Sequence, residues 1–216
     1  TLFVLGAAWL LAGRALRPVR SAMETQRAFM ADASHELRTP LAVVRAHAEA
    51  GLGSTDPEAL AASLRVIARC AEGMGHLVSD LLFLARTDAV LERHPSSVEL
   101  HDLLEDVLDE LAPLAGARGR ALLLTSAEPL GATVDAPLVT RLVRALVENA
   151  LVHGGGPIEV GATRRAGLVC LTVDDAGPGI PEGERARVLT RFQRGEGSRG
   201  APGHGLGLAI ARAVTE

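Results

Sequence analysis

Residues 29–41 read FMADASHELRTPL and hold a single imidazole, His35. Around it, apolar residues recur at steps of three and four, the periodicity of a helix with one packed face; they are Met30, Ala33, Leu37, Leu41, Val44 and Ala48. At about 100° per residue, His35 lies roughly 150° from the centre of that stripe. The ring is therefore predicted to face water or a docking partner, with Thr39 one turn further along the same face.

The residues beside His35 suit a chemical role. A lone histidine on a helix is usually a solvated polar residue, but Glu36, Thr39 and Pro40 accompany this one at fixed offsets. Glu36 can fix the tautomer of the ring and leave the other nitrogen nucleophilic near neutral pH. Pro40 has no N–H to donate to the carbonyl of Glu36, so we expect the helix to bend just after the histidine.

Residues 34–41, SHELRTPL, resemble without a gap the H box of bacterial sensor histidine kinases of the HisKA class. The resemblance implies that His35 is the residue that accepts a phosphoryl group. It also implies that Glu36 and Thr39 help to remove phosphate from a partner protein, which would be the receiver domain of a response regulator.

Composition sets loose limits on the class of protein. The chain has 216 residues, enough for one large or two small domains, and a net charge of −4 with a pI of about 6.0. The chain has no excess of positive charge of the kind that binds nucleic acid, so no direct nucleic-acid contact is expected. Cys70 and Cys170 lie far apart in apolar patterns, and we expect two reduced, buried thiols with no metal or disulfide role.

The amino end is apolar from Leu2 to Ala12, and Arg14, Arg17 and Arg20 follow directly. The run is shorter than the ~20 residues that span a bilayer, so a core helix or the apolar region of a signal peptide is also possible. A signal peptide carries its positive charges before the apolar run, whereas arginines after it are typical of the cytoplasmic end of a transmembrane helix. We therefore predict the end of such a helix at 1–16, a juxtamembrane linker at 17–28, and a location at the cell (plasma or inner) membrane with the catalytic part in the cytoplasm.

Two long helices are predicted next. The first runs from about Pro18 to Leu52, and Asp56 is a suitable N-cap for the second. The second helix carries a heptad seam of apolar residues: Leu60, Leu64, Ile67, Ala71, Met74, Val78, Leu81 and Ala85. Such a hairpin cannot bury both apolar faces alone, so we predict a dimerisation hairpin at 29–87 that forms a four-helix bundle as a homodimer. The alternative is packing of the hairpin against the next domain.

After a linker at 88–97 the periodicity changes. Short strands are expected at 98–100, 121–126 and 132–135, with helices at 101–118 and 137–153 and a hairpin of strands at 158–163 and 168–174, closed by 164–167. Strands and helices interleave without regular βαβ spacing. This pattern favours an α/β sandwich over residues 98–216.

Three features of this second domain suit a phosphate ligand. Asn149 lies within an apolar helix with no helix stop directly after it, and its amide oxygen is a hard ligand suited to Mg²⁺, although a capping role is the plainer alternative. Residues 173–180 run from a strand into acid-Gly-x-Gly, which alone could be a plain turn, yet a carboxylate there can accept from the amine of a base. Residues 203–210 place glycines at a helix start, where N–H groups bind anions.

In order and spacing these features resemble the N, G1 and G2 boxes of the same kinases, whose ATP-binding domain is of the GHKL type; residues 191–194 resemble the F box. The resemblance implies binding of ATP and Mg²⁺, with Asn149 on the metal and Asp175 on the adenine amino group. The remaining nucleotide-binding residues that it implies are His153, Gly177, Gly179, Arg194, Gly203, Gly205, Leu206 and Gly207. Residues 182–202 are predicted to form a mobile lid, or a plain loop.

The chain departs from the family pattern in three places. Ala145 stands where the family usually has a second asparagine, Val152 where a basic residue is common, and the chain ends at Glu216, before the closing strands of that domain. Two other functions stay open. A hydrolytic ATPase of related fold, as in type II topoisomerases and mismatch-repair proteins, needs a glutamate at the place of Ala145 and lacks an H box. A dimeric scaffold would bind the regulator without catalysis.

Overall fold

The computed structural model describes residues 2–87, 93–125, 129–193, 195 and 203–215 of the chain. The fold divides into two compact units, Thr1–Val78 and Ser79–Glu216, which we describe separately. The boundary falls inside the second helix, so the last turns of that helix belong to the second unit.

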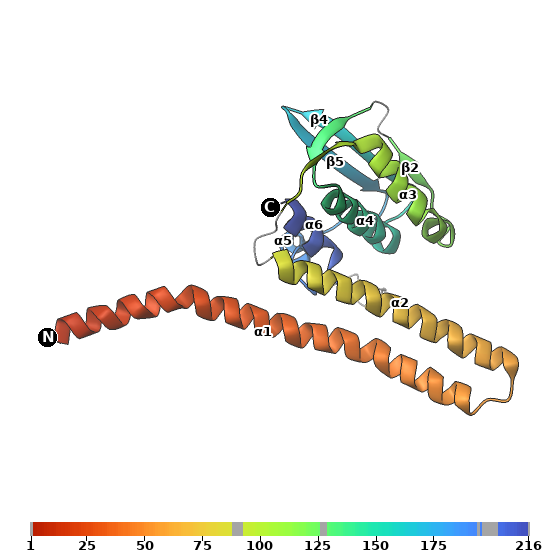
Figure 1. Cartoon of the computed structure of the whole chain (residues 1–216), viewed down its shortest axis with the longest axis horizontal. Coiled ribbons are helices and arrows are strands. Elements are labelled where there is room, and N and C mark those ends of the chain that lie inside the picture. The colour runs from red at the N-terminus through yellow and green to blue at the C-terminus, as the bar shows by residue number, and fades with distance from the viewer. Residues whose placement is uncertain (1, 88–92, 126–128, 194, 196–202, 216) are drawn as a thin grey trace. The chain divides into compact units, whose positions relative to one another are not determined.

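The first unit is a helical hairpin made of α1, Leu2–Leu52, and most of α2, Pro57–Thr87 (Figure 1). Asp56 caps α2 as predicted, because its Oδ1 accepts from the backbone N–H of Glu58 at 3.0 Å. The first helix begins earlier than the predicted Pro18 and runs without a break through Pro40. No helix in the described part of the chain has the length and apolar character needed to span a bilayer.

The hairpin leaves much of its predicted apolar surface uncovered. On α1, Met30 and Leu41 are 61% and 60% exposed, although both were predicted to face the core, while Ala33 is buried. On the predicted α2 seam, Leu64 and Val78 are 56% and 42% exposed. The reason is geometric: two helices share one narrow contact strip, and an apolar face wider than that strip needs a further layer.

The second unit contains two small sheets. The strands β1 (Ser96–Glu99) and β3 (Gly131–Val134) pair antiparallel. The other sheet has the order β2-β4-β5, with β2 parallel to β4 and β4 antiparallel to β5; its strands are Leu122–Leu124, Ile158–Arg165 and Leu168–Asp175. The β4–β5 turn is tighter than the predicted 164–167, since only Ala166 and Gly167 lie outside the ladder, both at positive φ.

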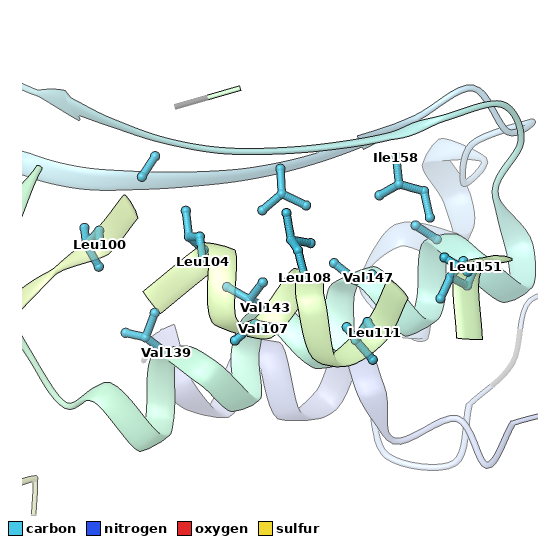
Figure 2. Close-up of a cluster of buried hydrophobic side chains, with 14 residues drawn as sticks. Leu100, Leu104, Val107, Leu108, Leu111, Val139, Val143, Val147, Leu151 and Ile158 are labelled. Atoms are coloured by element: carbon cyan, nitrogen blue, oxygen red, sulfur yellow. The ribbon is translucent and has the colours of Figure 1, made fainter. Parts of the chain in front are cut away.

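Helices α3 (Leu100–Gly116) and α4 (Ala136–His153) bury their apolar faces together with the inner face of β4, and Figure 2 shows the resulting cluster. Fully buried members include Leu104, Val143 and Ile158. This arrangement confirms the predicted α/β sandwich. Two short helices complete the unit: α5 (Glu182–Val188) and α6 (Gly207–Thr215). Residues 182–188, the first part of the segment predicted as a mobile lid or a plain loop, are helical, so the plain loop is wrong for this part.

The end of α2 is held on α4 by one arginine. The Nη2 atom of Arg141 donates to Asp80 Oδ1 at 2.8 Å and to Ser79 Oγ at 3.2 Å. The guanidinium carbon also lies 4.3 Å from the centre of the Phe83 ring, within the range of a cation–π interaction. Since the ion pair is only 26% and 32% exposed, solvent screens it less than it screens a surface pair.

We expect Arg141 and Asp80 to be energetically coupled. In a double-mutant cycle of Arg141→Ala and Asp80→Ala, urea unfolding should give a coupling energy of about 1 kcal/mol. The pair Arg45–Glu49 on α1 is the matched control, because its side chains are 82% and 67% exposed, and its coupling should stay below about 0.5 kcal/mol. Equal coupling in the two cycles would contradict the anchoring role of Arg141.

Candidate functional site

His35 lies on α1 with its side chain exposed, as the sequence predicted. Thr39 is exposed one turn later, and Glu36 is half-buried beside it. The hydroxyl of Ser34 is engaged with its own helix, since Oγ donates to the carbonyl of Met30 at 2.7 Å. The imidazole is therefore accessible on the first unit, which is the condition for any reaction at its nitrogens.

In the second unit, the loop after α4 is hydrogen-bonded to the loop after β5. The N–H groups of Gly155 and Gly177 both donate to Asp175 Oδ1, at 3.4 and 2.6 Å. The N–H of Ala176 donates to the carbonyl of Gly155 at 2.8 Å. Both bonds to Asp175 use one oxygen while the side chain is exposed, so the carboxylate is fixed in direction and still open to a ligand.

The two loops approach so closely that only glycine fits. A Cβ on Gly154 would lie 2.5 Å from both the carbonyl oxygen of Ala150 and Asp175 Oδ1. A Cβ on Gly177 would lie 2.6 Å from the same carboxylate oxygen and 2.7 Å from the Cα of Gly154. Gly177 was predicted from acid-Gly-x-Gly, whereas the Gly154–Gly156 run was overlooked; its signal was three successive glycines directly after a helix.

The start of α6 lies against the middle of α4. Gly203 and Gly205 precede the helix at φ 122° and 68°, conformations that favour glycine. Leu206 is buried, and a Cβ on Gly207 would lie 3.4 Å from the carbonyl oxygen of Ala145. The first N–H groups of a helix have no partner within it, so this terminus presents donors beside α4.

Residues 190–193 are joined to the same loop, because the N–H of Phe192 donates to the carbonyl of Gly205 at 3.0 Å. In this segment, which resembles the F box, Arg191 donates to the carbonyl of Leu84 at 3.4 Å. Arg194 lies outside the described residues. The structure thus joins the segment that resembles the F box to the one that resembles the G2 box.

Helix α4 puts these parts in line. Asn149 is half-buried and lies one turn after Ala145 on the same face, so it stands between the start of α6 and the loop that holds Asp175. From Ala145 to Gly154 the helix rises roughly 13 Å, at about 1.5 Å per residue. His153 ends α4 and is exposed, as is Gly179 at φ 71°.

A metal ion fits this site only if water and a bound nucleotide supply most of its ligands. Among the described residues, no group of three or more His, Cys, Asp and Glu side chains could hold one. The amide oxygen of Asn149 is a hard donor of the kind that Mg²⁺ takes. Because Mg²⁺ keeps several waters and shares phosphate oxygens of a nucleotide, a single protein ligand is compatible with it.

Comparison with known proteins matches two parts of the chain to domain families. Residues 25–90 match the His Kinase A (phospho-acceptor) domain, and residues 134–216 match the histidine kinase-, DNA gyrase B-, and HSP90-like ATPase domain. The chain belongs to the HisKA-class sensor histidine kinases. The matched ranges hold His35 in the first domain and the Asn149, Asp175 and Gly207 positions in the second.

Two sensor kinases and one solved structure are similar to this chain over most of its length. The chain is 39% identical over 206 residues to the sensor protein kinase PmrB of Pseudomonas aeruginosa, covering 93% of this chain and 43% of PmrB. It is 42% identical over 207 residues to the probable sensor histidine kinase TcrY of Mycobacterium tuberculosis, covering 91% of this chain and 42% of TcrY. The structure of full-length ShkA in complex with AMPPNP is similar at a TM-score of 0.63 and 25% identity, over 84% of this chain and 39% of ShkA. This chain therefore spans less than half the length of each of these proteins.

We expect Gly154→Ala to weaken nucleotide binding by roughly tenfold or more, because the added carbon displaces Asp175 or the end of α4. Titration with a fluorescent ATP analogue measures the affinity of each variant for nucleotide. The control is Gly183→Ala in α5, where a Cβ meets nothing within 4 Å. Indistinguishable affinities for the two variants would show that the close approach is not needed for binding.

Proposed function

We propose that this protein is an ATP-dependent protein-histidine kinase of a two-component system. The second unit binds ATP with Mg²⁺, the γ-phosphoryl group passes to His35, and an aspartate in the receiver domain of a response regulator then takes it. The observation that carries the proposal is the line of three parts along α4: the amides of α6, Asn149, and the fixed carboxylate of Asp175.

Recognition of the nucleotide would begin at the base. Asp175 accepts a hydrogen bond from the adenine amino group through the part of its carboxylate that the loop leaves open, while Gly177 and Gly179 let the backbone pass close to the ring. The phosphates lie toward the start of α6, where Gly203, Gly205 and Gly207 allow backbone N–H groups to face them. His153, Arg194 and Leu206 complete the proposed nucleotide-binding set.

The metal would be held by Asn149 together with the nucleotide phosphates. When bound, Mg²⁺ neutralises charge on the phosphate oxygens. The protein's own part is to hold the triphosphate in a fixed direction, with the base anchored at one end of the site and the phosphates at the other. Positioning and charge neutralisation are the main means of catalysis in phosphoryl transfer.

The reaction at His35 is a displacement at phosphorus. A ring nitrogen forms a bond to the γ-phosphorus as the bond to the bridging β–γ oxygen breaks, and ADP leaves with that electron pair. The carboxylate of Glu36 accepts a hydrogen bond from the N–H of the other ring nitrogen. This bond stabilises the positive charge that develops on the ring. The receiver aspartate later attacks the phosphorus and breaks the N–P bond. Glu36 and Thr39 are also proposed to assist the phosphatase activity, in which phosphate is removed from the receiver domain.

A homodimer follows from the surface of the hairpin. Met30 and Leu41 on α1 and the α2 seam leave apolar side chains exposed along both helices. A second copy would cover them in a four-helix bundle. The proposed location is the cell membrane, with the catalytic part in the cytoplasm, as supported by the arginines after the apolar run at Leu2–Ala12 and by the sensor kinases among the relatives.

We expect the full-length protein to incorporate phosphate from labelled ATP in a form that is stable to alkali and labile to acid. His35→Gln should abolish the label, because glutamine has no nucleophilic ring nitrogen to accept the phosphoryl group. His76→Gln is the control, because His76 is also exposed on a helix of the hairpin and should keep full labelling. Label that persists in His35→Gln would reject His35 as the acceptor.

Replacement of Asn149 tests the metal role. Asn149→Ala should lower the magnesium-dependent part of ATP affinity by about tenfold and lower the labelling rate, whereas Asn149→Asp keeps an oxygen ligand and should retain more of both. Magnesium titrations of ATP binding measure the difference. If the wild-type protein binds ATP and never labels itself, the non-catalytic scaffold is the correct function.

A further inference from the structure

One arginine outside every recognised motif binds the loop after α4. The guanidinium of Arg120 donates from Nη1 to the carbonyls of Ala150 and Gly154, at 3.3 and 3.1 Å, and from Nη2 to that of Gly155 at 2.8 Å. Its Nε donates to the carbonyl of Gly156. A single side chain thus contacts the last turn of α4 and all three glycines that follow it.

The place of this contact is electrostatically favourable. The last carbonyl groups of a helix have no partner within it and carry the negative end of the helix dipole. Arginine has five donors in a rigid plane and is always charged, so it can satisfy several carbonyls at once. Arg120 is half-buried, and its guanidinium meets these carbonyls at a helix that ends in a glycine.

The loop needs such an external anchor. Glycine has more conformational freedom than any other residue, and a run of three has no side chains with which to fix itself. Gly155 nevertheless binds the loop after β5 at two points. Its N–H donates to Asp175 Oδ1, and its carbonyl accepts from the N–H of Ala176 as well as from Arg120. The direction of the Asp175 carboxylate therefore depends on the position of Gly155, which Arg120 fixes.

We propose that Arg120 is a positioning residue for base recognition: it holds Gly154–Gly156 so that Asp175 meets the adenine amino group. This inference rests on the proposed binding of ATP by the second unit. It assigns adenine selectivity partly to a residue that lies 30 positions or more before its partners in the sequence and acts through the glycine loop.

The experiment compares Arg120→Ala and Arg120→Lys with wild type in the full-length protein. Arg120→Ala should raise KM for ATP by roughly tenfold or more, with kcat changed by less than about threefold, because base contacts and not the phosphates are affected. The preference for ATP over GTP should fall, since the direction of Asp175 sets that preference. Arg120→Lys should lie between, because an ammonium has fewer donors and no planar fork.

Arg118→Ala is the matched control. Arg118 is two residues away and exposed, and it donates at 3.5 Å to the carbonyl of Leu114 near the end of α3, so KM and base preference should stay at the wild-type values. A general loss of structure would lower ATP and GTP use alike and leave their ratio unchanged, and that result would overturn the inference, as would an unchanged KM in Arg120→Ala. A wild-type protein that binds no ATP would instead reject the proposed function itself.

Discussion

The second unit depends on the close approach of two backbones, the loop after α4 and the loop after β5. A side chain as small as a methyl group on Gly154 or Gly177 would overlap Asp175. Because the loops touch, their amides reach the carboxylate, and a residue at the end of a strand gains a fixed direction from a helix end far away in sequence. The preference for glycine here is therefore steric, since Gly154 has a backbone conformation open to any residue.

Helix α4 transmits this constraint to the rest of the site. One face is buried in the core with α3 and the sheet, which fixes its rotation, and Ala145 on another face meets the start of α6. Asn149 lies on the same helix. Its position along the helix axis, between the start of α6 and the loop that holds Asp175, therefore follows from helix geometry alone. A site built on a packed helix is more exact than one built on loops, and here the loops are tied to that helix.

The sequence predicted what depends on local pattern. Most of the helices and strands, the Asp56 cap and the outward direction of His35 follow from periodicity and caps, and the structure agrees. The early start of α1 and the helix at 182–188 were not predicted. It predicted less well what depends on partners. Met30 and Leu41 fit a buried stripe by spacing, yet a lone hairpin cannot cover both. Arg120 and Gly154–Gly156 carried no pattern that periodicity detects, since their meaning lies in contacts across 30 or more residues.

Ala145, which stands where the family usually has an asparagine, lies at the contact between α4 and α6. The family's usual asparagine at this place would supply one more polar group, whereas the side chain of Ala145 ends at a Cβ that lies 3.9 Å from the position of a Cβ on Gly207. A larger side chain needs space at the point where α4 and α6 meet, and it would shift the amides that are proposed to face the phosphates. Because alanine supplies no polar side chain at this place, backbone donors carry a larger share of the proposed phosphate contacts in this chain and side chains a smaller one.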